Sequence, residues 1–163
     1  MIEQVNYTGN TVKDYELFLK QLDSLMEDET NSIALLSNIS SLLNQFLDNV
    51  NWVGFYLWNE DELVLGPFQG LPACFRIGYG KGVCGTAVKE RKTQRVDNVL
   101  EFPGHIFCDS ASQSEIVIPI FVHGVVYGVL DIDSPIKSRF SRTDQQYLEK
   151  AINKLENVLE QVL

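Results

Sequence analysis

The sequence predicts one domain of the α/β class (α+β type), a mainly antiparallel central sheet with helices packed on both faces. Two observations lead to this prediction: amphipathic helical patterns lie at both ends of the chain, and two pairs of strand-like segments lie between them. The 163 residues, 45% of them hydrophobic, are enough for one core and too few for two comfortable ones. We therefore expect a single domain over residues 1–163.

The helices are predicted from apolar residues that recur every three or four positions, at residues 11–29, 31–49 and 142–163. Ser141 followed by Asp144 resembles a capping box at the start of the last helix. The expected layout has N-terminal helices within residues 1–50, the sheet and its active-site loops within 51–134, and a closing helix at 141–163.

The strands are predicted as two hairpins. NWVGFYLW and LVLGPFQG flank the polar turn NEDE, and EIVIPIFV (115–122) and VVYGVLDID (125–133) flank the tight turn His123-Gly124. Between the hairpins, the glycine-rich residues 70–85 are predicted as mostly loop, followed by a short helix in GTAVKERK and a second loop at 100–114.

The net charge of −9 argues against nucleic acid or an anionic membrane surface as the main partner, because both select for clustered Lys and Arg. The first residues lack the charged and apolar segments of a leader peptide, and no apolar run approaches the roughly 18 residues of a transmembrane helix. We therefore expect a cytoplasmic protein.

The three cysteines, Cys74, Cys84 and Cys108, are an odd number without a C-x-x-C pair, which argues for reduced thiols rather than a structural disulfide framework. With only two histidines, no metal site is expected. Cys108 lies among small polar residues in a predicted loop, where it is either incidental or reactive, and the neighbouring Asp109 would raise its pKa. Cys74 is either an apolar filler or a resolving thiol if the two loops meet. Cys84 begins a helix whose dipole would activate its thiol. Its apolar neighbours instead favour a packing role, as a half-buried residue between other side chains.

Three carboxylates lie at strand ends. Glu115 opens one predicted strand, and Asp131 and Asp133 close its hairpin partner, where their i, i+2 spacing puts both on one face. Because the start of one antiparallel strand lies beside the end of the next, these side chains are expected to converge. The alternative is that they are ordinary solvated acids.

Aromatic residues alternate on the first predicted strand. Trp52, Tyr56 and Trp58 share one of its faces and either line a ligand pocket or belong to the core. His105 and His123 have no metal-ligand spacing, and we interpret them as turn or surface residues.

GVVYGVLDIDSP followed by FSRTDQQYLE resembles the closing signature of GAF domains, small α/β ligand-binding modules. NWVGFYLW, LGPFQGLPACFRI, GVCGTA and HIFCDSASQSEIVIPI, in this order, are similar to the free methionine-(R)-sulfoxide reductases, a single-domain GAF family. The resemblance covers nearly the whole chain beyond the first helix and includes all three cysteine contexts. It implies a GAF-like fold and a thiol-dependent oxidoreductase that reduces free L-methionine-(R)-sulfoxide.

Carried over by position, the resemblance implies Cys108 as the nucleophile, Cys74 as the resolving cysteine and Cys84 as a further, less essential thiol. It also implies a substrate pocket with acidic residues and an aromatic wall, which are Glu115, Asp131 and Asp133, and Trp52 and Tyr56.

The implied reaction begins with attack of the Cys108 thiolate on the sulfoxide sulfur, which leaves methionine and a sulfenic acid on Cys108. Cys74 then forms a disulfide with Cys108, and the resemblance implies thioredoxin as its reductant, without a metal or an organic cofactor. Carboxylates that pair with the substrate ammonium would select the free amino acid over a peptide-bound residue.

Two other functions fit the same sequence. One is a non-enzymatic GAF sensor of a small ligand or of oxidation, against which a lone domain offers no output module to regulate. The other is a structural or dimerisation module that uses the first and last helices, although a homodimer would also be compatible with the enzyme.

Overall fold

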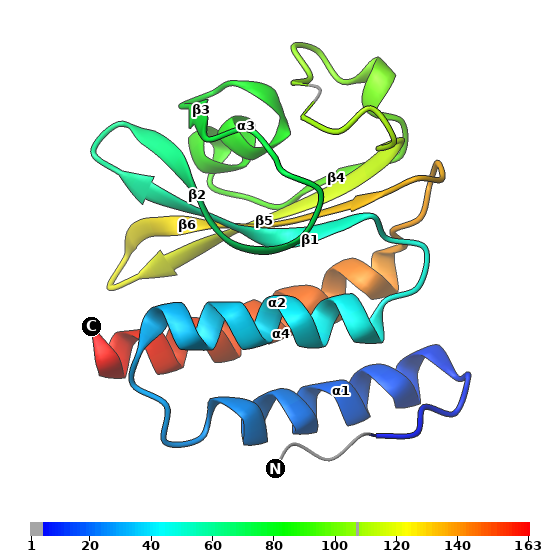
Figure 1. Cartoon of the computed structure of the whole chain (residues 1–163), viewed down its shortest axis with the longest axis vertical. Coiled ribbons are helices and arrows are strands. Elements are labelled where there is room, and N and C mark those ends of the chain that lie inside the picture. The colour runs from blue at the N-terminus through cyan, green and yellow to red at the C-terminus, as the bar shows by residue number, and fades with distance from the viewer. Residues whose placement is uncertain (1–4, 107) are drawn as a thin grey trace.

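The computed structural model describes residues 5–106 and 108–163, and it confirms the predicted fold class (Figure 1). Six strands form one antiparallel sheet in the order β3-β2-β1-β6-β5-β4. The strands are β1 Trp52–Asn59, β2 Glu62–Gly70, β3 Arg76–Gly78, β4 Gln94–Val96, β5 Ser114–Val122 and β6 Val125–Ser134. The two predicted hairpins, β1–β2 and β5–β6, meet in the middle of the sheet, where β1 pairs with β6.

The helices cover both faces of this sheet, as predicted. They are α1 Thr11–Met26, α2 Ser32–Phe46, α3 Gly82–Glu90 and α4 Arg142–Val162, with a short 3-10 turn at Val99–Glu101. Figure 1 shows α2 and α4 beneath the sheet, α1 as an outer layer below them, and α3 on the opposite face. The predicted capping box of Ser141 and Asp144 begins α4. Among residues 5–106 and 108–163, no helix is long and apolar enough to cross a membrane.

Side-chain alternation decides which residues face α3. On β6, Ile132 belongs to the large core shared with α1, α2 and α4, whereas Val129 belongs to a smaller core under α3. Asp131 and Asp133 have the same parity as Val129, so they also point to the α3 side. Glu115 of β5 lies directly opposite Asp133 in the strand pairing. The expected convergence of the three carboxyls is therefore confirmed by the register of one hairpin.

Several element boundaries differ from those predicted. The first two helices end at Met26 and Phe46, three residues early, and Asp28 and Asn49 just beyond them have left-handed backbone conformations that helices do not continue through. The glycine-rich segment contains β3, and α3 starts at Gly82 rather than 85. The second predicted loop includes residue 107, which lies outside the described residues.

Gly85 fixes how α3 meets the loop before it. Its carbonyl oxygen accepts a hydrogen bond from the Gly80 N–H at 3.0 Å, and its own N–H donates to the Lys81 carbonyl at 2.9 Å. A Cβ atom at this position would overlap the backbone carbonyl oxygen of Gly78. Only glycine permits this close approach, which also holds the adjacent Cys84 in place.

We therefore expect Gly85→Ala to lower the free energy of unfolding by roughly 2–4 kcal/mol, because backbone must move to admit the methyl group. Denaturant unfolding followed by circular dichroism measures the change. The control is Gly78→Ala, whose added Cβ would meet only the flexible Lys81 side chain, at 3.2 Å. Losses of similar size in the two variants would contradict this explanation.

Candidate functional site

A pocket between the sheet and α3 brings most of the predicted site residues together. Its free volume is about 30 Å³, room for about two water molecules. Seven of the eight predicted site residues line it, namely Trp52, Tyr56, Cys84, Cys108, Glu115, Asp131 and Asp133. The eighth, Cys74, is joined to the pocket through a covalent bond.

Cys74 and Cys108 form a disulfide with their Cα atoms 5.5 Å apart. The two cysteine loops therefore do meet, and the pairing implied by the resemblance is confirmed. The expectation of reduced thiols, made from the odd number of cysteines and the lack of a C-x-x-C pair, holds for Cys84, which is free and buried, whereas Cys74 and Cys108 are bonded here. Tyr56 anchors the Cys74 side of the bond, because its hydroxyl donates to the Cys74 carbonyl oxygen at 2.9 Å.

Both carboxylate oxygens of Asp109, the neighbour of Cys108, accept hydrogen bonds. Oδ2 accepts a hydrogen bond from Asn51 Nδ2 at 2.9 Å, and Oδ1 accepts one from the Ala111 N–H, also at 2.9 Å. These two hydrogen bonds fix the carboxylate against the start of β1 and against its own turn. Two donors therefore stabilise its negative charge, which does not act on the sulfur of Cys108 alone.

The three carboxyls form one cluster. Glu115 and Asp131 are each 6% exposed and Asp133 is partly exposed. Burial raises the pKa of all three well above their ordinary values, and repulsion between neighbouring carboxylates raises each pKa further. The alternative of solvated strand-end acids is therefore wrong. One oxygen each of Asp131 and Asp133 is buried without a hydrogen-bond partner in the described chain, so each can still accept a hydrogen bond from a polar ligand.

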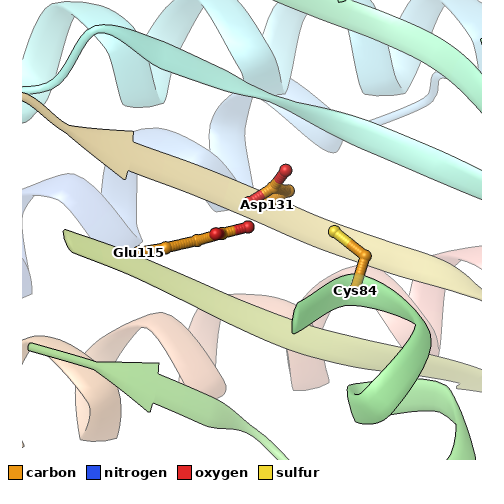
Figure 2. A group of neighbouring side chains, drawn as sticks. All are labelled: Cys84, Glu115 and Asp131. Carbon is orange, nitrogen blue, oxygen red and sulfur yellow. The ribbon is translucent and has the colours of Figure 1, made fainter. Parts of the chain in front are cut away.

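Cys84 reaches the same cluster from α3. Figure 2 shows its sulfur directed toward Asp131 of β6 and Glu115 of β5, and ligand atoms of these three residues lie within 4.8 Å of one another. This spacing would suit a metal ion, which would first have to displace protons from the three groups. Burial, followed by the charges of Asp131 and Glu115, raises the pKa of the Cys84 thiol. Activation of Cys84 by the helix dipole is therefore the wrong interpretation.

Trp52 and Tyr56 form one wall of the pocket and also belong to the core beneath α3. Their rings stack with centroids 5.8 Å apart, and Trp52 stacks on Phe68 at 5.1 Å. These two residues thus belong to the core and also line the pocket, whereas their contact with a ligand stays a prediction. Trp58 lies farther along the strand and contacts Tyr79 instead.

His105 is a pocket residue that the sequence did not identify. Its side chain is only 5% exposed, and its Nε2 lies 3.5 Å from a carboxyl oxygen of Glu115. The backbone of His105 does close a turn, because its N–H donates to the Phe102 carbonyl oxygen at 3.2 Å, so only its interpretation as a surface residue is wrong. His123 lies in an exposed turn, as interpreted. Burial lowers the pKa of His105 and raises that of Glu115, so both groups are shifted toward neutrality. A useful signal was its position in the short stretch that also contains Cys108 and Glu115.

The carboxyl cluster makes stability depend on pH in an unusual direction. Between the ordinary pKa values, 3.8 for Asp and 4.5 for Glu, and their raised values, the folded state holds more protons than the unfolded state. Stability from this source is complete below the ordinary values and is lost as pH rises through the raised ones. Glu115→Gln should therefore flatten the decline of unfolding free energy with rising pH, measured by denaturant titration of the oxidised protein.

The matched control for this measurement is Glu16→Gln, on the exposed face of α1, which should keep the wild-type pH dependence. If Glu115→Gln and wild type lose stability with the same slope as pH rises, the cluster does not hold the protons assigned to it.

Known proteins resemble this chain in both fold and sequence. The GAF domain family model matches residues 31–159. The free methionine-R-sulfoxide reductase of Escherichia coli is 49% identical over 92% of this chain and 91% of its own. The solved fRMsr of Staphylococcus aureus in complex with substrate is 54% identical, with a TM-score of 0.86 over 96% of this chain and 99% of that one. The free methionine-R-sulfoxide reductase of Neisseria meningitidis, also solved with its substrate, is 41% identical, with a TM-score of 0.95 over 99% and 98% of the chains. The chain therefore belongs to the GAF-domain family and, within it, to the free methionine-R-sulfoxide reductases.

Proposed function

We propose that this protein reduces free L-methionine-(R)-sulfoxide to L-methionine in the cytoplasm, and that thioredoxin recycles it. The observation that carries the proposal is the Cys74–Cys108 disulfide, which closes over a pocket of buried carboxyls with raised pKa values. A disulfide in this position is the product expected after a cysteine has accepted an oxygen atom and a second cysteine has displaced it. The Escherichia coli relative carries the name of this activity.

In the first step, the sulfur of reduced Cys108 attacks the sulfoxide sulfur. The attack forms a bond between the two sulfurs, and the sulfoxide oxygen takes up a proton. The hydroxyl group then passes to the Cys108 sulfur as the sulfur–sulfur and the substrate sulfur–oxygen bonds break, which leaves a sulfenic acid on Cys108 and methionine with one electron pair returned to its sulfur. Buried Glu115 and Asp131 are suited to protonate the oxygen of the substrate, because their raised pKa values let them hold protons to higher pH than ordinary carboxyls do. Cys74 then attacks Cys108, water leaves, and the disulfide forms.

The same cluster supports selection of a free amino acid. A substrate ammonium that approaches the carboxyls favours their charged form, so a proton leaves the cluster and an ion pair takes its place. Asp133 is the most exposed of the three residues, and its buried Oδ1 has no hydrogen-bond partner in the described chain that an ammonium would have to displace. A peptide-bound methionine lacks this charge and would leave the cluster unpaired. Trp52 and Tyr56 offer the apolar wall for the substrate methyl group.

The disulfide form excludes the substrate. A free volume of about 30 Å³ is far smaller than an amino acid, so binding requires the Cys108 loop to lie elsewhere once the bond is reduced. Isothermal titration should show that the oxidised wild type binds L-methionine-(R)-sulfoxide at least roughly tenfold more weakly than Cys108→Ser, which cannot form the bond. Equal affinities would contradict a pocket closed by the disulfide.

The activity itself is tested with thioredoxin, thioredoxin reductase and NADPH. We expect NADPH oxidation with free L-methionine-(R)-sulfoxide, and little with the S epimer or with the N-acetylated analogue, whose amino group carries no charge. A protein that consumes no NADPH with the free R epimer, although its disulfide has been reduced beforehand, does not have the proposed activity and is better explained as a sensor.

The two cysteine roles are separated by single-turnover measurements on reduced protein. Cys108→Ser should form no methionine, because it has no nucleophile. Cys74→Ser should form about one methionine per protein and then stop at the sulfenic acid, which an alkylating probe for that group detects. Cys84→Ser is the matched control and should retain turnover. Similar yields from Cys108→Ser and Cys74→Ser would reject this assignment.

A further inference from the structure

Exposed apolar side chains flank both halves of the Cys74–Cys108 disulfide. Leu71 is 65% exposed, Phe75 is 74% exposed and Ile106 is 37% exposed, and each lies within three residues of a bonded cysteine. We call these three residues the apolar rim. Single exposed hydrophobic residues are common on protein surfaces, but three around one bond that another molecule must reach indicate a contact surface.

The backbone holds the rim in a fixed position. The carbonyl oxygen of Leu71 accepts a hydrogen bond from Trp52 Nε1 at 3.1 Å, and that of Phe75 accepts one from the Leu65 N–H at 3.0 Å. The segment is thereby attached to β1 and β2 while the Leu71 and Phe75 side chains remain exposed. Ile106 lies over the first residue of α3. A surface that is already ordered loses little conformational entropy when a partner binds.

The charge beside the rim differs from that of the whole chain. Residues 63–89 contain three basic residues and no Asp or Glu, although the net charge of the chain is −9. Two of the basic residues, Arg76 and Lys81, are exposed and follow Phe75 closely. Arg76 lies 3.4 Å from Glu62 in an exposed pair, which exchanges readily with other partners. This segment therefore complements an acidic partner.

We propose that the apolar rim is the docking surface for a protein dithiol of the thioredoxin type, and that the partner surface that fits it is apolar and acidic around the reactive cysteine. This inference rests on the proposed function, because it requires a protein to recycle the disulfide. The partner thiolate attacks one sulfur, which forms a mixed disulfide and releases one cysteine of this chain. The second partner thiol then displaces the other, so two electrons and two protons pass to Cys74 and Cys108 while the partner becomes a disulfide.

The test measures reduction of the disulfide in the oxidised full chain without methionine sulfoxide. NADPH, catalytic thioredoxin reductase and varied thioredoxin give the second-order rate constant, and dithiothreitol gives the rate for a small reductant that needs no docking. Phe75→Ser and Leu71→Ser should lower the thioredoxin rate roughly tenfold, as loss of a central apolar contact does, and leave the dithiothreitol rate unchanged. The control Ile33→Ser, at a 66% exposed position on α2 across the sheet, should keep both rates.

Thioredoxin rates that stay unchanged in both rim variants would overturn the docking surface. An equal fall in the dithiothreitol rate would also overturn it, because the substitutions would then act on the disulfide itself. A wild-type disulfide that thioredoxin does not reduce would also contradict it. If instead the proposed function is wrong, the result differs. Thioredoxin then reduces the disulfide at the normal rate, but adding methionine sulfoxide causes no NADPH oxidation.

Discussion

The site depends on one constraint, the burial of three carboxyl groups in a pocket with room for only about two water molecules, too few to hydrate them all. Glu115, Asp131 and Asp133 lie side by side on one hairpin, so each can ionise only against burial and the charge of its neighbours. The cluster consequently retains protons to higher pH than ordinary carboxyl groups do. The same environment raises the pKa of the Cys84 thiol, and the carboxyls line the same pocket as Cys108.

The molecule separates this fixed cluster from the part that carries redox chemistry. The carboxyls and aromatic residues belong to central strands, and Cys84 to a helix held against the sheet by the close approach at Gly85. Cys74 and Cys108 instead lie in two loops whose ends are attached to that frame and whose cysteines bond across the pocket. In the proposed cycle, the acid cluster stays in place while formation and reduction of the disulfide close and open the route to it.

Periodicity predicted much of this arrangement. Alternation placed Asp131 and Asp133 on one face, and hairpin pairing placed Glu115 beside them, because both follow from local rules. The Cys74–Cys108 pairing came only from the resemblance, since no local rule states which loops meet. His105 was missed because its burial depends on how the second loop folds back over β5. The raised pKa of Cys84 was missed because the carboxyls that cause it are distant in sequence.

Infrared difference spectroscopy of the oxidised protein in water and heavy water tests directly whether the buried cluster holds at least one proton at neutral pH. We expect a protonated carboxyl band in the wild type that shifts in heavy water and that Glu115→Gln or Asp131→Asn removes or displaces. A wild-type spectrum with only ionised carboxylate bands at neutral pH would contradict this expectation.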